Sequence, residues 1–330
     1  MSYFMSLNPL SLFRAMPGSI AQGMIWGVMA LGVYITFRLL DFADLTVDGS
    51  IATGAAVSVM LIRAGVSPIA TLPIAFLAGA LAGMVTGLLN TALGIPGILA
   101  SILTQISLYS INLNIMGKAN QPVSVDNYPL VVSLRYVTDG SVSRLLFFLG
   151  MIVFLLALIA VMYWYFGTEQ GHAIRATGCN SNMARAQGIK TNFIKVLALM
   201  ISNGLVGLCG ALYGQFQGAS DVNMGRGAIV IGLAAVFFGG VFLLGGGGLA
   251  AVIIGEVLFG KFASKRKLAF AFTLASVILG AVIYYMVYQF VLWLKMPSED
   301  MKLFSAIVVA IFLAIPYLKE KRTLRKGASK

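Results

Sequence analysis

Long apolar stretches recur along the whole chain, and they constrain its fold more than any other feature of the sequence. A helix needs about 20 predominantly apolar residues to cross a bilayer, and most of these stretches reach or approach that length. They are continuous rather than alternating, which favours α-helices over a β-barrel. We place them at about 18–40, 45–62, 67–90, 98–116, 144–166, 191–214, 226–243, 248–260, 268–294 and 302–318.

The composition excludes most other classes of protein. Hydrophobic residues make up 59% of the 330 positions and charged residues 10%, whereas soluble domains carry about 25% charged residues. The two cysteines, Cys179 and Cys209, provide no disulfide framework. No early stretch has the layout of a cleavable signal peptide, so we expect the first apolar segment to remain as a span. The sequence therefore predicts an all-α polytopic membrane protein.

Nearly all of the net charge of +12 lies in three polar stretches. Residues 319–330 carry a net +5, residues 261–267 a net +4 and residues 167–190 a net +2. Basic residues concentrate in the cytoplasmic loops of membrane proteins, so we expect these stretches inside and the neutral stretch 117–143 outside. The basic residues are not interleaved with aromatic ones, and no nucleic acid is expected as a partner.

This topology sets the number of spans. The segment 248–260 is too short to cross a bilayer alone, and a cytoplasmic 261–267 requires it to enter and leave on one side. We predict a single transmembrane domain over 1–330 with about nine transmembrane helices plus a re-entrant half-helix. Residues 79–87 resemble residues 247–255, as in an inverted repeat. Their shared Gly/Ala/Leu composition explains the likeness equally well.

The sequence offers no catalytic or metal-binding constellation. His172 is the only histidine and has no neighbouring cysteine or carboxylate cluster. Residues 255–261 match the spacing of a phosphate-binding loop, but Phe262 stands where a Ser or Thr would bind Mg²⁺. We therefore expect no enzyme activity in this chain.

The polar loop 167–190 is the most informative stretch. Asn180 or Ser181 suits the N-cap of a short helix, and Gly188 suits its end. A short helix between two spans on the basic side could dock in a groove of a soluble partner. A plain solvated connector would fit the same pattern.

Several motifs resemble those of ATP-binding cassette (ABC) importer permeases of the branched-chain amino acid and ribose superfamily. Arg175–Gly178 followed by Met183–Ile189 is similar to their coupling-loop motif, and the tryptophan/tyrosine-type permeases resemble the chain most. The likeness continues through residues 41–49, 202–205, 221–225 and 254–260. One departure is a second copy of Gly-Leu-Ala-Ala-Val, at 232–236 and again at 248–252.

The resemblance implies a function and a set of partners. It implies the transmembrane permease subunit of an importer, forming the path for a small solute such as an amino acid, in the bacterial plasma (inner) membrane. A separate ATPase subunit would hold ATP and Mg²⁺, leaving no cofactor in this chain. An extracytoplasmic solute-binding protein would deliver the solute, and a second permease copy, as a homodimer embedded in membrane lipid, would complete the pore.

Two sets of site residues follow. The loop motif assigns the ATPase contact to Arg175, Ala176, Thr177, Gly178, Met183, Ala184, Arg185, Ala186 and Gly188. Polar groups inside apolar segments usually face a cavity or another helix. On this ground we assign to the translocation path Asp44, Thr46, Asp48, Gln105, Asn203, Asp221, Asn223 and Glu256.

The alternative function is an ion- or proton-coupled secondary transporter. That class needs ionisable groups within the membrane to carry the coupling charge, and Glu256 is the clearest candidate. A purely structural membrane protein is disfavoured by polar residues within the spans, such as Asn90, Gln105, Asn112 and Asn203.

Overall fold

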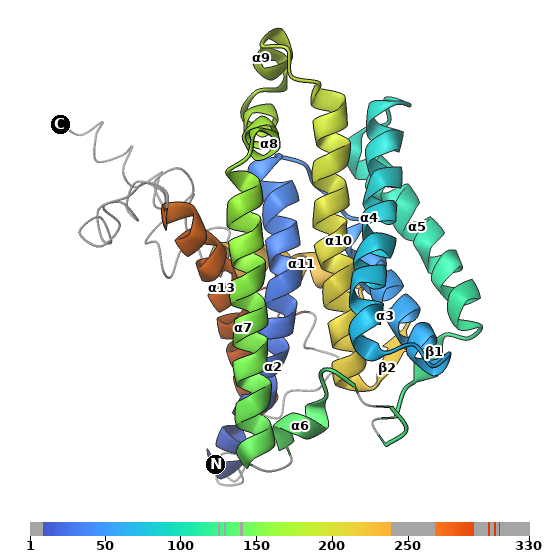
Figure 1. Cartoon of the computed structure of the whole chain (residues 1–330), viewed down its shortest axis with the longest axis vertical. Coiled ribbons are helices and arrows are strands. Elements are labelled where there is room, and N and C mark those ends of the chain that lie inside the picture. The colour runs from blue at the N-terminus through green and yellow to red at the C-terminus, as the bar shows by residue number, and fades with distance from the viewer. Residues whose placement is uncertain are drawn as a thin grey trace, which may run out of the picture. The chain divides into compact units, whose positions relative to one another are not determined.

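The structure is a computed structural model that describes residues 9–124, 126–128, 130–138, 141–238 and 268–293, with single positions at 303, 307 and 310. This part of the chain is mainly helical (Figure 1). Six of its helices are long and apolar enough to cross a membrane. They are Ser11–Leu39, Pro68–Thr91, Gly97–Met116, Arg144–Phe166, Thr191–Gln217 and Phe270–Trp293. The expectation of a helical, multi-span protein is confirmed at this level.

Most predicted apolar segments correspond to helices. In chain order the elements are α2 (Pro9–Val33), π-helix η1 (Tyr34–Leu39), α3 (Val47–Arg63), α4 (Pro68–Thr91), α5 (Gly97–Met116), β1 (Asn120–Pro122), α6 (Leu134–Thr138), α7 (Ser141–Phe166), α8 (Glu169–Cys179), α9 (Ser181–Ala186), α10 (Thr191–Gln217), β2 (Ala219–Asp221), α11 (Ala228–Phe238) and α13 (Leu268–Trp293). The predicted half-helix 248–260 lies outside the described residues. So does the segment 302–318, apart from the three single positions.

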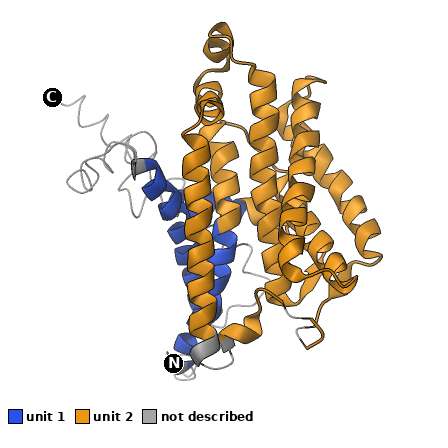
Figure 2. Cartoon of the chain, viewed as in Figure 1, with its two compact units in different colours: residues 1–27, 230–330 blue, residues 28–229 orange. Residues whose placement is uncertain are grey.

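The chain divides into two compact units, coloured separately in Figure 2. One comprises residues 1–27 and 230–330, and within it the start of α2 packs on α13. A Cβ on Gly23 would lie 2.6 Å from Val282 Cα, so the two backbones touch there. The Ser19 hydroxyl also donates to Gln289 Oε1 at 2.9 Å.

Residues 28–229 form the larger unit, and α10 lies at its centre. Helix α4 runs antiparallel to α10 along glycines spaced four residues apart. A Cβ on Gly79 would lie 2.2 Å from Asn203 O, and one on Gly83 would lie 2.2 Å from Leu199 O. Small residues at this spacing let helix backbones approach closely. The glycines of α4 therefore form a packing surface for α10.

Helix α3 lies against another side of α10 and runs parallel to it. A Cβ on Gly54 would fall 1.9 Å from Gly207 O, and one on Gly210 would fall 2.0 Å from Ile51 O. With 17 residues, α3 is shorter than its neighbours. It begins beside the middle of α10, where the Ser50 hydroxyl donates to Asn203 Oδ1 at 2.7 Å.

Residues 40–46, which connect η1 to the start of α3, are not helical. Asp41 has a φ of 54°, in the left-handed region that non-glycine residues rarely adopt. Irregular backbone at membrane depth is tolerated only where protein or water satisfies it. Here Asp44 is 1% exposed, and its carboxylate accepts hydrogen bonds from neighbouring groups.

The two ends of the larger unit carry different loops. Figure 1 shows α8 and α9 at one end and β1, β2 and α6 at the other, with α7 running between them. Strand β1 pairs antiparallel with β2, with Gln121 opposite Ser220. This arrangement agrees with the predicted opposite exposure of 167–190 and 117–143.

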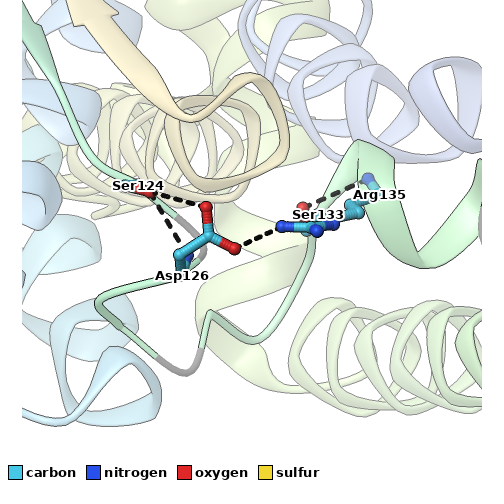
Figure 3. A network of polar contacts seen from close by, with 4 residues as sticks. All are labelled: Ser124, Asp126, Ser133 and Arg135. Carbon is cyan, nitrogen blue, oxygen red and sulfur yellow. Dashed lines mark hydrogen bonds and ion pairs between the residues drawn. The ribbon is translucent and has the colours of Figure 1, made fainter.

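The loop that follows β1 neutralises its own charges. Figure 3 shows Arg135 directed at Asp126, with which it forms an ion pair. The Ser124 hydroxyl accepts the Asp126 backbone N–H at 3.3 Å, and the Ser133 hydroxyl accepts that of Arg135 at 3.2 Å. Both charged side chains are exposed, so the pair contributes little stability. The pair does neutralise the charge of Arg135 on this face.

Helix α7 presents large apolar side chains outward along much of its length. Leu145 is 74% exposed and Trp164 71% exposed. An apolar surface of this extent is stable in lipid or against a partner, not in water. This exposure agrees with a place in the membrane.

The close contact between α4 and α10 can be tested by adding one methyl group. We expect Gly83→Ala to destabilise the protein by about 1–3 kcal/mol, because its Cβ would overlap Leu199 O and the helices would have to separate. The measurement is thermal unfolding of the purified protein in detergent.

Gly150→Ala in α7 is the matched control. Nothing lies within 4 Å of its added Cβ, and alanine is the better helix former by about 0.5–1 kcal/mol. Equal stability of the two variants would contradict the close contact.

The native cysteines test the topology. Cys179 is exposed and Cys209 is buried, so a membrane-impermeant maleimide should label only Cys179, and only from the cytoplasmic side. Cys179→Ser should abolish labelling. Adding Asn127→Cys to that variant should restore it from the outside, because residue 127 is exposed in the opposite loop. Labelling of Cys179 in intact cells would refute this orientation.

Candidate translocation path and coupling loop

The polar loop 167–190 folds as a pair of short helices, α8 and α9, joined at Asn180. The Asn180 side chain accepts hydrogen bonds from the backbone N–H groups of Asn182 at 3.1 Å and Met183 at 3.0 Å. Gly188 has a φ of 84° and ends the second helix, with its N–H bonded to Arg185 O. The predicted cap and the predicted end are both confirmed, and Asn180 rather than Ser181 is the cap.

The structure divides the predicted ATPase contact residues into two groups. Five positions are exposed and available to a partner: Ala176, Met183, Arg185, Ala186 and Gly188. Met183 is the most prominent apolar one, at 64% exposed. Arg185 also donates to the Thr191 hydroxyl at 3.3 Å, which steadies it at the loop surface.

The remaining predicted contacts face the permease itself. Thr177 and Ala184 are buried, at 3% and 4% exposed. A Cβ on Gly178 would lie 1.9 Å from Leu39 O, so α8 rests directly on the end of η1. Among the small residues predicted to contact the ATPase, Gly178 and Ala184 instead seat the loop on its own chain, whereas Ala176 and Ala186 are exposed.

Arg175 is half-buried and belongs to neither group. Its guanidinium carbon is 5.7 Å from the centroid of the Phe166 ring, a cation–π distance. Burial lowers the pKa of the Arg175 guanidinium, and nearby Tyr34 opposes that shift. Arg175 therefore helps to hold α8 against α7 and η1, in addition to any contact with a partner.

Three of the predicted path residues belong to buried hydrogen-bond networks. The Asn203 amide donates to Asp44 Oδ2 at 2.6 Å and accepts from the Ser50 hydroxyl. The Thr46 hydroxyl lies 2.8 Å from that of Thr86, which donates to the Thr104 hydroxyl at 2.9 Å. Asp44, Thr46 and Asn203 thus join α3, α4, α5 and α10 in the interior and do not face an open path.

Asp48 connects α3 to α11. Its two carboxylate oxygens accept the backbone N–H groups of Gly227 and Ile229, each at 3.0 Å. A carboxylate at a helix N-terminus satisfies otherwise unpaired N–H groups and complements the helix dipole. Gly225 packs directly against the backbone of Asp48, because a Cβ on Gly225 would lie 1.9 Å from Asp48 O. The starts of two short helices therefore meet at Asp48.

A polar cavity of about 290 Å³ lies beside this junction. Three predicted path residues line it: Asp48, Gln105 and Asn223. The other lining residues are Gly49, Ile106, Tyr109, Ser110, Asn112, Val222 and Arg226. We refer to it below as the polar cavity.

Of the described path residues, Asp221 does not line this cavity. Asp221 ends β2, and its carboxylate accepts the Asn223 N–H at 2.6 Å, which shapes the turn that carries Asn223. Glu256 lies outside the described residues.

A second cavity, of about 440 Å³, differs in chemistry. Its walls include Leu72, Val132, Phe147, Phe154 and Leu212, and Tyr136 contributes a hydroxyl that already donates to Leu130 O. An apolar cavity of this kind suits hydrocarbon. The polar cavity is the better candidate for a hydrophilic solute.

Sequence reasoning missed several functional candidates. Tyr109, Asn112 and Arg226 line the cavity but are not among the path residues predicted from the sequence. Helix α5 carries many polar residues and Arg226 lies in a turn far away in the sequence, so only the fold shows which of them share a cavity. In the described part of the chain, no cluster of three metal-ligating side chains occurs.

Residues 16–316 match the protein family described as branched-chain amino acid transport system / permease component. The tyrosine transport system permease protein of Clostridioides difficile (strain R20291) is 38% identical over 295 residues, which is 89% of either chain. No solved structure matches this chain.

Two further relatives are permeases of the same kind. The autoinducer 2 import system permease protein LsrC of Yersinia pseudotuberculosis (strain YPIII) is 32% identical over 70% of this chain and 62% of its own. The inner membrane ABC transporter permease protein YjfF of Escherichia coli (strain K12) is 27% identical over 67% of this chain and 66% of its own. With its apolar helices, this chain is a multi-pass plasma membrane protein that belongs to the permease components of the branched-chain amino acid transport family.

Proposed function

We propose that this permease subunit forms the translocation path of an ABC importer for a small solute, an amino acid, with transport driven by ATP hydrolysis on a separate subunit. The exposed helix pair α8–α9, seated on the core at one end of the larger unit, carries the proposal. The tyrosine permease among its relatives supports the solute class. ATP and Mg²⁺ would bind to the ATPase, and this chain would catalyse no reaction.

The contacts of α8 give a physical route from the ATPase to the polar cavity. Gly178 packs against Leu39 at the end of η1. Residues 40–46, which include Asp44, connect Leu39 to the start of α3. Asp48, in the first turn of α3, holds the start of α11. A shift of α8 is therefore expected to move the junction of the two short helices. Such a continuous set of packed elements can carry coupling between distant sites.

The two short helices also support the proposed repeat. Helix α3 follows a non-helical segment that approaches from the α8 end of the unit, and α11 follows one that approaches from the β2 end. Substrate sites that lie where discontinuous helices begin are typical of transporters built from internal repeats. We retain about nine spans with a re-entrant half-helix as the architecture of the full chain.

Other partners complete the proposed transporter. A solute-binding protein would dock at the end formed by β1, β2 and α6, and a second copy of the permease would cover part of the exposed apolar surface. The runner-up, an ion-coupled secondary transporter, is disfavoured by the family to which the chain belongs.

The proposed ATPase contact is tested by reversing one exposed charge. Arg185→Glu should leave the protein folded, because the side chain is exposed. It should abolish co-purification with the ATPase and ATP-dependent uptake, because a fully desolvated contact of a charged side chain contributes about 2 kcal/mol or more. The measurements are pull-down from membranes and uptake of radiolabelled L-tyrosine.

Two further variants sharpen that test. Lys118→Glu makes the same charge change in the exposed loop at the opposite end and should retain ATPase binding. Ala184→Asp should instead lower folded yield, because it buries a carboxylate inside the loop. Full ATPase association by Arg185→Glu, with normal stimulation of hydrolysis, would show that the loop is only a connector.

The junction of the short helices is tested at Asp48. Asp48→Ala leaves the N–H groups at the start of α11 without their acceptor and should destabilise the protein by about 1–2 kcal/mol. Asp48→Asn retains one carbonyl oxygen as an acceptor and should lose less stability than Asp48→Ala. Thermal unfolding and uptake are measured together, and normal stability of the alanine variant would contradict a structural cap.

A further inference from the structure

The polar cavity has a buried inner end and an exposed rim. Gly49, Asn112 and Val222 at the inner end are buried, whereas Asn223 and Arg226 at the rim are exposed. The wall between them is formed by α5, which contributes Gln105 and Tyr109. A solute entering past the rim would therefore meet Asn112 last.

Asn112 differs from the other polar residues of α5. It is fully buried, and neither Nδ2 nor Oδ1 has a hydrogen-bond partner within the described part of the protein. By contrast, Ser101 donates to Ile98 O at 2.9 Å and Thr104 donates to Ala100 O at 3.0 Å. A buried polar group without a partner costs about 1–3 kcal/mol. Because Asn112 also lines the cavity, a molecule bound there is available as a partner for its amide.

The cavity also presents charges of both signs. The Arg226 guanidinium stands at the rim, and no ion pair to it occurs among the described residues. Asp48 accepts backbone N–H groups through both oxygens, but a carboxylate offers about four acceptor sites. One cavity can thus pair with a carboxylate and an ammonium group at the same time.

We infer that the polar cavity is a solute-binding site for a small zwitterion, with Arg226 binding its carboxylate, Asp48 its ammonium group and Asn112 a polar group at its far end. The inference rests on the proposed function and names the solute's contacts within it. The volume of about 290 Å³ lies at the lower end of the range for small-molecule sites, as a solute of amino-acid size requires. Tyr109 and Ile106 supply an aromatic and an apolar wall for its side chain.

The experiment measures binding of tritiated L-tyrosine to the permease–ATPase complex in lipid nanodiscs, without any solute-binding protein. L-tryptophan and L-leucine are tested in the same assay. We expect Asn112→Leu to weaken the binding by about 10-fold or more, because the solute's polar group loses its partner. The same variant should unfold at an equal or higher temperature than the wild type, since it removes an unsatisfied buried amide.

Asn114→Leu is the matched control. Asn114 lies on the same helix, is exposed and does not line the cavity. Its replacement should leave binding unchanged. A structural role for Asn112 would instead lower stability and binding together in the Asn112→Leu variant.

Arg226 is tested through the ligand's carboxylate. In the wild type, tyramine, which lacks a carboxylate, should compete at least 10-fold less well than L-tyrosine. In Arg226→Gln that preference should disappear, and in Arg226→Lys part of it should return. An equal loss of affinity for L-tyrosine and tyramine in Arg226→Gln would contradict a contact between Arg226 and the carboxylate.

The outcomes separate this inference from the proposed function. Wild-type affinity in both Asn112→Leu and Arg226→Gln would overturn the binding site, as would the absence of binding by all three amino acids. Co-purification with the ATPase, scored on the same samples, decides the proposed function independently. A complex that retains its ATPase but binds no zwitterion leaves the permease role standing and refutes the site.

Discussion

Direct contact between the backbone of α10 and those of α3 and α4 is the interaction on which the larger unit depends. Glycines on all three helices remove the side chains that would keep the axes apart. Apolar side chains gain little from association in lipid, so close van der Waals packing has to supply the driving force. The same closeness brings short polar side chains within hydrogen-bond reach across the helices, as at Ser50 and Asn203.

The buried polar groups then determine the register of these helices. A slip of α3 along α10 would separate Ser50 from Asn203, and a slip of α4 would separate Thr86 from Thr46. Gln215 performs the same task nearer the far end of α10, where its amide donates to the Ser58 hydroxyl at 3.2 Å and its oxygen accepts the Val131 N–H at 3.1 Å. Unsatisfied polar groups are costly in such surroundings, so a single register is favoured.

The sequence predicted the helices well because the length of an apolar stretch is a local property. It also predicted the cap at Asn180 and the helix end at Gly188, which depend on side chains a few residues apart. It failed where a residue's direction matters. Thr177 and Ala184 look like docking residues by their size, yet they face inward. Asp44 and Asp48 look alike in sequence, but one lies in a closed network and the other at a cavity wall, which depends on partners more than 150 residues away.

The way in which Asp48 holds the start of α11 has a consequence for how such a protein can evolve. The carboxylate binds main-chain groups of Gly227 and Ile229. The attachment therefore does not depend on which side chains the neighbouring turn carries, apart from the close fit at Gly225 and the left-handed φ of 85° at Gly227. Residues 223 and 226 are therefore free to vary while the scaffold that presents them is preserved. With the solute bound in the polar cavity as inferred above, permeases built on this plan can acquire new solute preferences through a few rim substitutions, without first acquiring compensating changes in the helices beneath.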